Sequence, residues 1–445
     1  MTHIDLTLTP RRAAVIEGAD TELDVLVSVS APDTPALSRS RMPLNLAIVI
    51  DRSGSMAGTP LAEAKRCAGY ILEHLSMRDR VALVTFDSAV TVLAPSTIPE
   101  PKEPLLRAVR SIVSGGQTAL HEGWLQGAEQ AAPHVVQGSI ARVLLLTDGQ
   151  ANIGESRPAM LAADCARLAA AGVSTSTYGL GQGFREELLG AMADAGGGQA
   201  YYGETAEDLM DPFREEFDLL SAVCGRRMRL RIEPSPGVSV TVRNTYRTDP
   251  DGNAILPDLA YGAAAWALLR VKVPAALQEA EPGRILHVLS AFVTYQDGEG
   301  RPQSSRTAHL RLPRMPQAAF AALPEDELTA SRALELRSAD LLTEARAAAD
   351  RDDWDLVEKI LARARAQAGD NEWVARSIEE LQKYALLRDP RFSKEAYFLA
   401  RKKNLRLAEP GEDGPYSLLE ETLKPGYVRR KLRQGKDLRG EPFGS

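Results

Sequence analysis

The sequence predicts an α/β domain with a doubly wound, mostly parallel sheet, inserted into a β-sandwich and followed by a helical bundle. Three patterns support this prediction. Between residues 43 and 223, continuous apolar runs alternate with amphipathic helical patterns, as in domains built on a parallel sheet. The segments on either side alternate apolar and polar residues with the period of two that is typical of β-strands. From residue 325 to 388, the apolar residues recur at helical spacing.

Two strand patterns, HIDLTLTP and ELDVLVSVS, lie within residues 1–42. A pair of strands alone is only marginally stable in water. Further strand patterns, joined by turn sequences such as DPDGN and DGEG, fill residues 224–315. We therefore expect residues 1–42 and 224–315 to form one β-sandwich, which the α/β domain at residues 43–223 splits in two.

The α/β domain begins with LNLAIVI, a continuous apolar run typical of a strand buried on both faces. We expect further strands at VALVTF, RVLLLT and VSTSTYGL, an edge strand at AVTVL and a short last strand at QAYYG. Helical patterns lie between them, at about residues 61–75, 105–113, 120–132, 159–171, 186–193 and 207–223.

Residues 325–388 contain three amphipathic helical patterns. They resemble one tetratricopeptide-like hairpin plus a capping helix, and because no second copy follows, we predict no repeat array. Residues 389–445 are punctuated by Pro and Gly and lack a clear period, so we expect a basic C-terminal tail, mobile or docked. Its Lys and Arg residues between 424 and 445 leave open a contact arm for an acidic partner.

Composition argues against several classes of protein. With 60 acidic and 53 basic residues, the net charge of −7 does not fit a dedicated nucleic-acid binder. The longest apolar stretch, near residues 259–273, contains Arg270 and Lys272 and is too short to span a membrane. The three cysteines are widely spaced, which favours a reducing compartment, and MTHIDLTLTPRR lacks the apolar core of a signal peptide. We therefore expect a cytoplasmic protein.

Side chains that can bind a hard cation follow two of the expected strands. LNLAIVI leads into DRSGS, residues 51–55, and VLLLT leads into an Asp-Gly pair at residues 148–149. Between them lies SGGQT, residues 114–118, a Gly-rich turn that presents a threonine just before a helix. Because ligands of an open α/β sheet bind outside the carboxyl ends of the strands, we expect these three segments to meet at one edge.

The three segments supply two carboxylates and three hydroxyls, from Asp51, Asp148, Ser53, Ser55 and Thr118. Mg²⁺ favours octahedral oxygen coordination, keeps several waters and uses few carboxylates directly. Neutral hydroxyl ligands would leave the ion short of negative charge, so that an incoming Asp or Glu carboxylate can take an open position. Alternatively, Asp51 and the two serines only cap the next helix. Capping does not account for Thr118 and Asp148 at the same edge.

The segments DRSGS, GGQT and LLLTDG resemble the metal-ion-dependent adhesion site of the von Willebrand factor A family, bacterial multidomain type, and the resemblance covers residues 43–223. It implies that Ser53 and Ser55 ligate the metal directly, and that Thr118 does so when ligand is bound and through water otherwise. Asp51 and Asp148 would hold coordinated waters. The implied ion is Mg²⁺, with Mn²⁺ or Ca²⁺ as alternatives. GGQT departs mildly from the family pattern, with one residue between the glycine pair and the threonine.

The resemblance implies an adaptor rather than an enzyme: a module that binds an acidic side chain of a partner protein through the metal. Similar layouts occur in the inter-alpha-trypsin inhibitor heavy chains. The family also suggests an AAA+ ATPase of the MoxR type as a partner. Two alternatives stay open, namely a structural module in which the metal only stabilises loops, and a non-catalytic subunit of a chelatase-like ATPase complex.

Motifs of other chemistries are missing from the sequence. GLGQG, residues 179–183, lacks the G-x-G-x-x-G pattern of dinucleotide-binding loops, and no P-loop pattern occurs. The six histidines are scattered, and His121-Glu122 is not part of an H-E-x-x-H zinc motif. Neither serine of DRSGS lies in a G-x-S-x-G elbow. These observations give no support to a hydrolase or an oxidoreductase.

Overall fold

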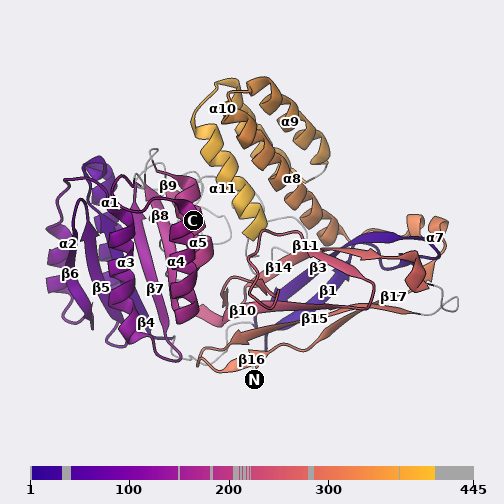
Figure 1. The fold of residues 1–445 in the computed structure, drawn as a ribbon, viewed down its shortest axis with the longest axis horizontal. Coiled ribbons are helices and arrows are strands. Elements are labelled where there is room, and N and C mark those ends of the chain that lie inside the picture. The colour runs from indigo at the N-terminus through magenta and orange to yellow at the C-terminus, as the bar shows by residue number, and fades with distance from the viewer. Residues whose placement is uncertain are drawn as a thin grey trace, which may run out of the picture. The chain divides into compact units, whose positions relative to one another are not determined.

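The computed structural model describes residues 3–32, 42–148, 151–180, 184–203, 222–278, 285–369 and 371–405, together with Met210, Phe213, Phe217 and Leu220. The chain divides into two compact units (Figure 1). Among the described residues, one unit contains residues 42–223 and the turn at 297–301, and the other joins residues 3–32 to residues 224–296 and 302–405. The predicted insertion of an α/β domain into a split sandwich is confirmed.

The α/β unit is built on a six-stranded sheet of order β6-β5-β4-β7-β8-β9. All neighbouring strands are parallel except β6, which runs antiparallel to β5. β6 lies at the edge of the sheet, as predicted. β4 and β7 lie at the centre and are buried along their whole length, in agreement with their continuous apolar sequences. The strands are β4 (Leu44–Asp51), β5 (Arg80–Phe86), β6 (Val90–Thr97), β7 (Ile140–Thr147), β8 (Val173–Leu180) and β9 (Gly197–Gly203).

Helices cover both faces of this sheet. The even-numbered side chains of β4 join a core with residues of α1 and α2, and with Met210, Phe213, Phe217 and Leu220. Of the predicted helix over 207–223, the structure otherwise describes only residues 222 and 223, and Val223 already belongs to β10. On the opposite face, α3 packs against β4, β5 and β7. The helices are α1 (Thr59–His74), α2 (Glu103–Arg110), α3 (Leu120–Ala131), α4 (Pro158–Ala171) and α5 (Glu186–Gly196), with two short 3₁₀ turns, η1 (Gly54–Met56) and η2 (Ala132–His134).

The sandwich in the second unit has two antiparallel sheets. One has the order β1-β3-β14-β11, and the other has the order β12-β10-β15-β16, with β13 beside β10 and β17 beside β15. β3 pairs with β14 over ten residues, from Thr21↔Val273 to Ser30↔Ala264, so the N-terminal strands complete the later sheet as predicted. The strands of the first sheet are β1 (Asp5–Pro10), β3 (Thr21–Ser30), β11 (Ser239–Val242) and β14 (Ala264–Val273). Those of the second are β10 (Val223–Pro234), β12 (Ala254–Ile255), β13 (Leu259–Ala260), β15 (Leu286–Gln296), β16 (Pro302–Ser304) and β17 (Ala308–Leu312). A two-residue parallel ladder joins β2 (Val15–Ile16) to β18 (Arg314–Met315).

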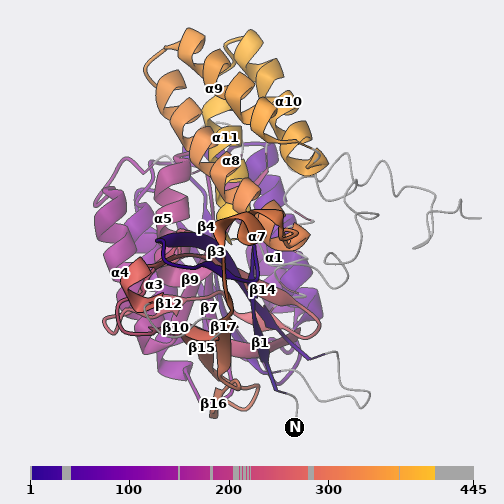
Figure 2. The same cartoon turned by 90° about the vertical axis from the view of Figure 1, so that its right-hand side faces the viewer.

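The helical bundle of this unit contains α8 (Glu327–Ala349), α9 (Trp354–Gln367), α10 (Glu372–Leu386) and α11 (Arg391–Leu405), preceded by α7 (Gln317–Ala322) (Figure 2). Three of these helices begin at Asp or Asn caps, Asp326, Asp353 and Asn371, each of which accepts the N–H three residues on. None of the described helices is both long and apolar enough to cross a membrane.

The prediction that a tail begins at residue 389 is wrong, because residues 391–405 form α11. Phe392, Ala396 and Ala400 recur every four residues and are buried in the core of the bundle. Two alanines give only a weak apolar signal among the surrounding Arg and Lys residues. The sequence pattern of residues 391–405 therefore does not indicate a helix clearly. The basic residues between 424 and 445 lie outside the described residues.

Candidate metal centre

Asp51 ends β4 and lies fully buried at the carboxyl edge of the sheet. Its Oδ1 accepts the backbone N–H of Ser53 at 2.8 Å, and its Oδ2 accepts the hydroxyl of Thr147, the last residue of β7, at 2.6 Å. Both oxygens therefore have neutral donors, and the carboxylate is fixed between the ends of the two central strands.

The two serines of the DRSGS segment bring their hydroxyls together. The Oγ atoms of Ser53 and Ser55 lie 3.2 Å apart, because the η1 turn folds the chain back directly after the strand. Ser53 is buried and Ser55 is exposed. The pair thus presents two neutral oxygen atoms, one within the edge of the sheet and one at its surface.

Backbone hydrogen bonds tie the Gly-rich turn to this segment. The N–H of Gly115 donates to the carbonyl of Arg52 at 2.7 Å, and the N–H of Gly54 donates to the carbonyl of Gly116 at 3.0 Å. Gly116 has a φ of +77°, and a Cβ there would lie 3.0 Å from the side chain of Asp87. Glycine is therefore required at this position, both for its backbone conformation and for the close approach.

Thr118 and Asp148 complete the edge. Asp148 directly follows β7, and the parallel register Ile50↔Leu146 brings it to the same end of the sheet as Asp51. The N–H of Thr118 donates to Asn152 Oδ1 at 2.7 Å, and the N–H of Asn152 donates back to the carbonyl of Thr118 at 3.2 Å. All five residues singled out from the sequence therefore belong to three loops that are hydrogen-bonded to one another.

Burial raises the pKa of Asp51 to about 6, although hydrogen bonds from Thr147 and Ser53 oppose this rise; the charge of Asp148 adds to it. The basic residue next in the chain, Arg52, directs its guanidinium to Asp87 at 2.6 Å. Within the described part of the chain, Asp51 has no ion-pair partner. An edge with two buried carboxylates and three hydroxyls is chemically suited to a cation.

The donor set distinguishes between kinds of metal. No group of three or more His, Cys, Asp or Glu side chains able to hold an ion occurs among the residues that the structure describes. The residues of the described ranges therefore offer no cluster of imidazoles or thiolates of the kind that zinc favours. The edge offers hydroxyls and a pair of carboxylates, which fit a hard ion that retains water.

Residues 45–215 match the family model of the von Willebrand factor type A domain. This segment is a von Willebrand factor type A (VWA) domain. Its central strands end at the edge described above, where the DRSGS and GGQT segments lie beside Thr147 and Asp148.

The alignments with relatives of known sequence are longer than the VWA domain. The chain is 27% identical over 247 residues to the uncharacterized protein sll0103 of Synechocystis, which covers 54% of this chain and 56% of that protein. It is 27% identical over 196 residues to YfbK of Escherichia coli, covering 43% and 34%, and 28% identical over 220 residues to the human inter-alpha-trypsin inhibitor heavy chain H4, covering 46% and 23%. The chain thus spans about half or less of these relatives.

Two solved structures share the fold over nearly the whole chain. A von Willebrand factor type A protein from Catenulispora acidiphila superposes with a TM-score of 0.67 at 17% identity, covering 91% of this chain and 97% of that one. The ArnB paralog VWA2 from Sulfolobus acidocaldarius has a TM-score of 0.60 at 16% identity, covering 90% and 97%. At these identities the likeness establishes the fold, which includes the regions outside the VWA domain.

Sequence reasoning missed Thr147 and Asn152, which hold Asp51 and Thr118 in place. Both lie within four residues of Asp148, in the segment TDGQAN. The sequence shows that both residues lie near the motif, but it does not show with which residues they form hydrogen bonds. The bond from Thr147 to Asp51 requires β4 and β7 to be neighbours, which the chain order does not reveal.

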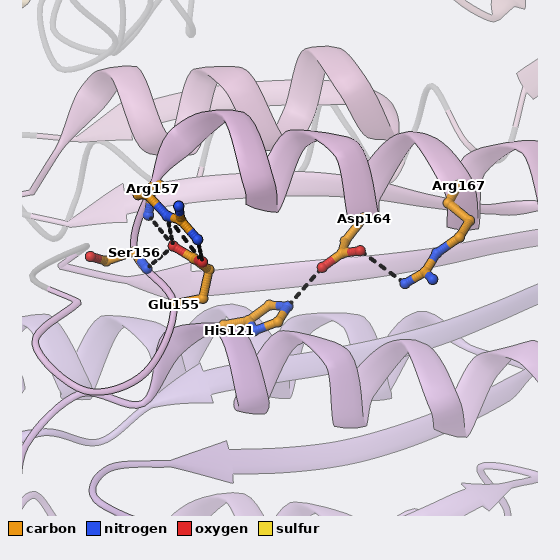
Figure 3. Close-up of polar contacts among 6 residues, drawn as sticks. All are labelled: His121, Glu155, Ser156, Arg157, Asp164 and Arg167. Atoms are coloured by element: carbon orange, nitrogen blue, oxygen red, sulfur yellow. Dashed lines mark hydrogen bonds and ion pairs between the residues drawn. The ribbon is translucent and has the colours of Figure 1, made fainter.

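Figure 3 shows polar contacts within the segment that precedes α4 and between α3 and α4. His121 Nε2 lies 3.1 Å from Asp164 Oδ2, and Asp164 Oδ1 accepts from Arg167 at 2.9 Å. Hydrogen bonds from the side chain and backbone of Arg157 lower the pKa of Glu155 to about 2. The contact of His121 with Asp164 links α3 to α4.

Proposed function

We propose that the VWA domain is a metal-dependent protein-interaction module, which binds Mg²⁺ at the edge formed by Asp51, Ser53, Ser55, Thr118 and Asp148. The observation that supports this most strongly is the buried Asp51, whose ionised form is disfavoured by burial and by Asp148. A divalent cation at this edge would offset both effects. The ion would supply a Lewis-acidic centre able to accept one more oxygen ligand.

The residues present divide into two roles. The hydroxyls of Ser53 and Ser55, 3.2 Å apart, would ligate the ion directly, and that of Thr118 would do so directly or through water. Asp51 and Asp148 would hold its waters and contribute charge. Because the direct ligands are neutral, the bound ion keeps a net positive charge, which favours a carboxylate from outside. Mn²⁺ or Ca²⁺ could replace Mg²⁺ in this scheme.

The partner that fits this chemistry is a protein with an exposed Asp or Glu. An AAA+ ATPase of the MoxR type is one such partner, and the chain would then act as a non-catalytic subunit of an ATPase complex. We propose that the chain itself catalyses no reaction and works in the cytoplasm as an adaptor.

Calorimetric titration of the chelated protein with MgCl₂ and MnCl₂ tests the metal site. We expect saturable uptake of one ion by the wild type, and loss of that uptake in Ser53→Ala and Asp148→Ala. Asp164→Ala is the matched control, because it removes a carboxylate that binds His121 and Arg167 outside the site. Absence of uptake by the wild type, or equal loss in the control, would overturn the proposal.

The role of the metal in partner binding needs a second measurement. With a purified partner, capture should require Mg²⁺ and should fail in both site variants. If Asp148→Ala lowers the melting temperature but leaves capture intact, the metal is structural and the partner binds elsewhere on the chain.

A further inference from the structure

A β-bulge interrupts β10 in the sandwich. It is far along the chain from the proposed metal site, the sheet edge with Asp51, Ser53, Ser55, Thr118 and Asp148, which is called the metal edge below. β10 pairs with β15 at Arg226↔Gln296 and again at Arg229↔Thr294. Two residues of β10, Arg227 and Met228, therefore oppose the single residue Tyr295 of β15. Bulges of this kind redirect a side chain and are common beside functional sites.

The bulge holds Arg227 in an unusual backbone conformation. Its φ is +52°, in the left-handed region that side-chain-bearing residues rarely adopt. Its N–H donates to Asp258 Oδ1 at 3.1 Å and not to a backbone carbonyl of the neighbouring strand. Glycine would adopt this conformation without strain, so an arginine at this position points to a role for its side chain.

Arg227 lines a polar groove of about 470 Å³ over β10, β15 and β16. No acidic side chain lines the groove among the described residues. The residues with polar side chains that line it are Arg227, Arg229, Thr294, Tyr295, Gln296, Gln303 and Ser304. The groove is thus rich in hydrogen-bond donors and carries positive charge.

The two arginines differ in whether their guanidinium group is already in an ion pair. Arg229 Nε forms an ion pair with Asp249 Oδ2 at 3.1 Å. No carboxylate within the described ranges lies within ion-pair distance of the guanidinium of Arg227, which is half-buried. The acids of the turn that follows β15, Asp297 and Glu299, are paired with Arg301. Arg227 is therefore the cation in this groove whose guanidinium N–H groups can bind an external anion.

We propose that this groove binds the phosphate group of a small phosphorylated molecule, with Arg227 as the binding residue. A guanidinium fork matches two oxygens of a phosphate. The hydroxyl of Thr294 and the amide of Gln296 supply further donors, and a phosphate has more acceptor oxygens to use them than a carboxylate has. The volume is that of a small-ligand pocket. The site is independent of the metal edge and of its proposed function.

Titration of the full chain with inorganic phosphate in the presence of EDTA tests the proposal, because chelation removes any metal that could hold the anion. We expect saturable binding by calorimetry, at least tenfold weaker in Arg227→Gln and several-fold weaker for acetate than for phosphate. The matched control is Arg231→Gln on the same strand, since Arg231 is paired with Glu233 at 3.0 Å and does not line the groove. Absence of saturation, an equal loss in the control, or acetate binding as tight as phosphate would each overturn the assignment.

Arg227→Gly separates ligand binding from structure. Relief of the backbone strain should raise the Tm by about 2–4 °C while phosphate binding is lost. A lower Tm in this variant would show that the arginine serves the bulge itself, and the proposed binding role would be rejected.

Discussion

The hydroxyl of Thr147 donates to Asp51 Oδ2 at 2.6 Å and so links the ends of β7 and β4 inside the metal edge. This bond stabilises the charged form of Asp51 against the effect of its burial. It also fixes the direction of the carboxylate. At the proposed metal site, Thr147 would therefore act through Asp51 and not by contact with the ion.

Thr147→Val is expected to weaken Mg²⁺ binding by about 10- to 100-fold, the range found for partners of metal-site residues. Valine has nearly the same shape and suits a buried strand, so the fold should persist. The matched control is Thr177→Val in β8, a buried threonine whose hydroxyl donates to the carbonyl of Leu189. Calorimetric titration should show no change in the affinity of the control. Equal affinities for Thr147→Val and the wild type would contradict the positioning role.

The pKa of Asp51 gives a pH dependence of stability in the metal-free protein. Because the folded pKa is raised to about 6, from an unfolded value near 3.9, the ionised group lowers the free energy of unfolding above pH 6. The two-unit difference corresponds to roughly 3 kcal/mol. This penalty should disappear as the pH falls from about 6 to 4. The measurement is urea unfolding of the wild type and Asp51→Asn, in EDTA, at several pH values.

The quantity that tests this prediction is the stability of the wild type minus that of Asp51→Asn, because the other carboxylates cancel in the difference. It should rise on acidification in EDTA. In saturating Mg²⁺ the ion should hold the carboxylate charged, and the rise should vanish. A difference that is flat with pH in EDTA would show that Asp51 titrates normally.

The sequence was sufficient to predict the strands of the VWA domain and to place five candidate residues in the loops at one edge of its sheet. That these residues bind a metal stays a prediction. The apolar runs of β4 and β7 are long and unbroken, and the motif residues follow them directly. Local patterns of this kind do not depend on which strands become neighbours. They can therefore be predicted before the fold is known.

The split sandwich was predicted, but several individual contacts between distant residues were not. The bond between Thr147 and Asp51 joins residues 96 apart in the chain, and that between Thr118 and Asn152 joins residues 34 apart. The bulge at Arg227 depends on how β10 and β15 pair. Helix α11 was missed because its buried residues are Phe392, two alanines and Lys403, which together carry little periodic apolar signal.

Removal of the metal should leave the fold intact. The core of the VWA domain consists of buried strands and helices that do not depend on the ion. Excess EDTA is expected to leave the far-UV circular dichroism unchanged and to lower the Tm, since an ion that binds only the folded state at 10–100 times its Kd adds about 1.4–2.7 kcal/mol. Mg²⁺ should restore the original Tm. Global loss of the dichroism signal on chelation would contradict weak, hydroxyl-based binding.

Two glycines of the VWA domain should respond in opposite directions to alanine. A Cβ at Gly127 in α3 would lie 2.3 Å from Val49 Cγ2 in β4, so the helix would have to move off the sheet. Gly127→Ala should destabilise the domain by about 1–3 kcal/mol. A Cβ at Gly69 in α1 would meet its nearest atom, Leu106 Cδ2, at 4.0 Å, which is ordinary contact.

Gly69→Ala should therefore stabilise the domain by about 0.5–1 kcal/mol, the gain expected for alanine over glycine within a helix. Chemical unfolding of both variants measures the two effects under one condition. Because both substitutions add the same methyl group to a helix, helix propensity is matched between them, and only the packing differs. If Gly127→Ala were as stable as Gly69→Ala, α3 could not lie as close to β4 as the packing of Gly127 requires.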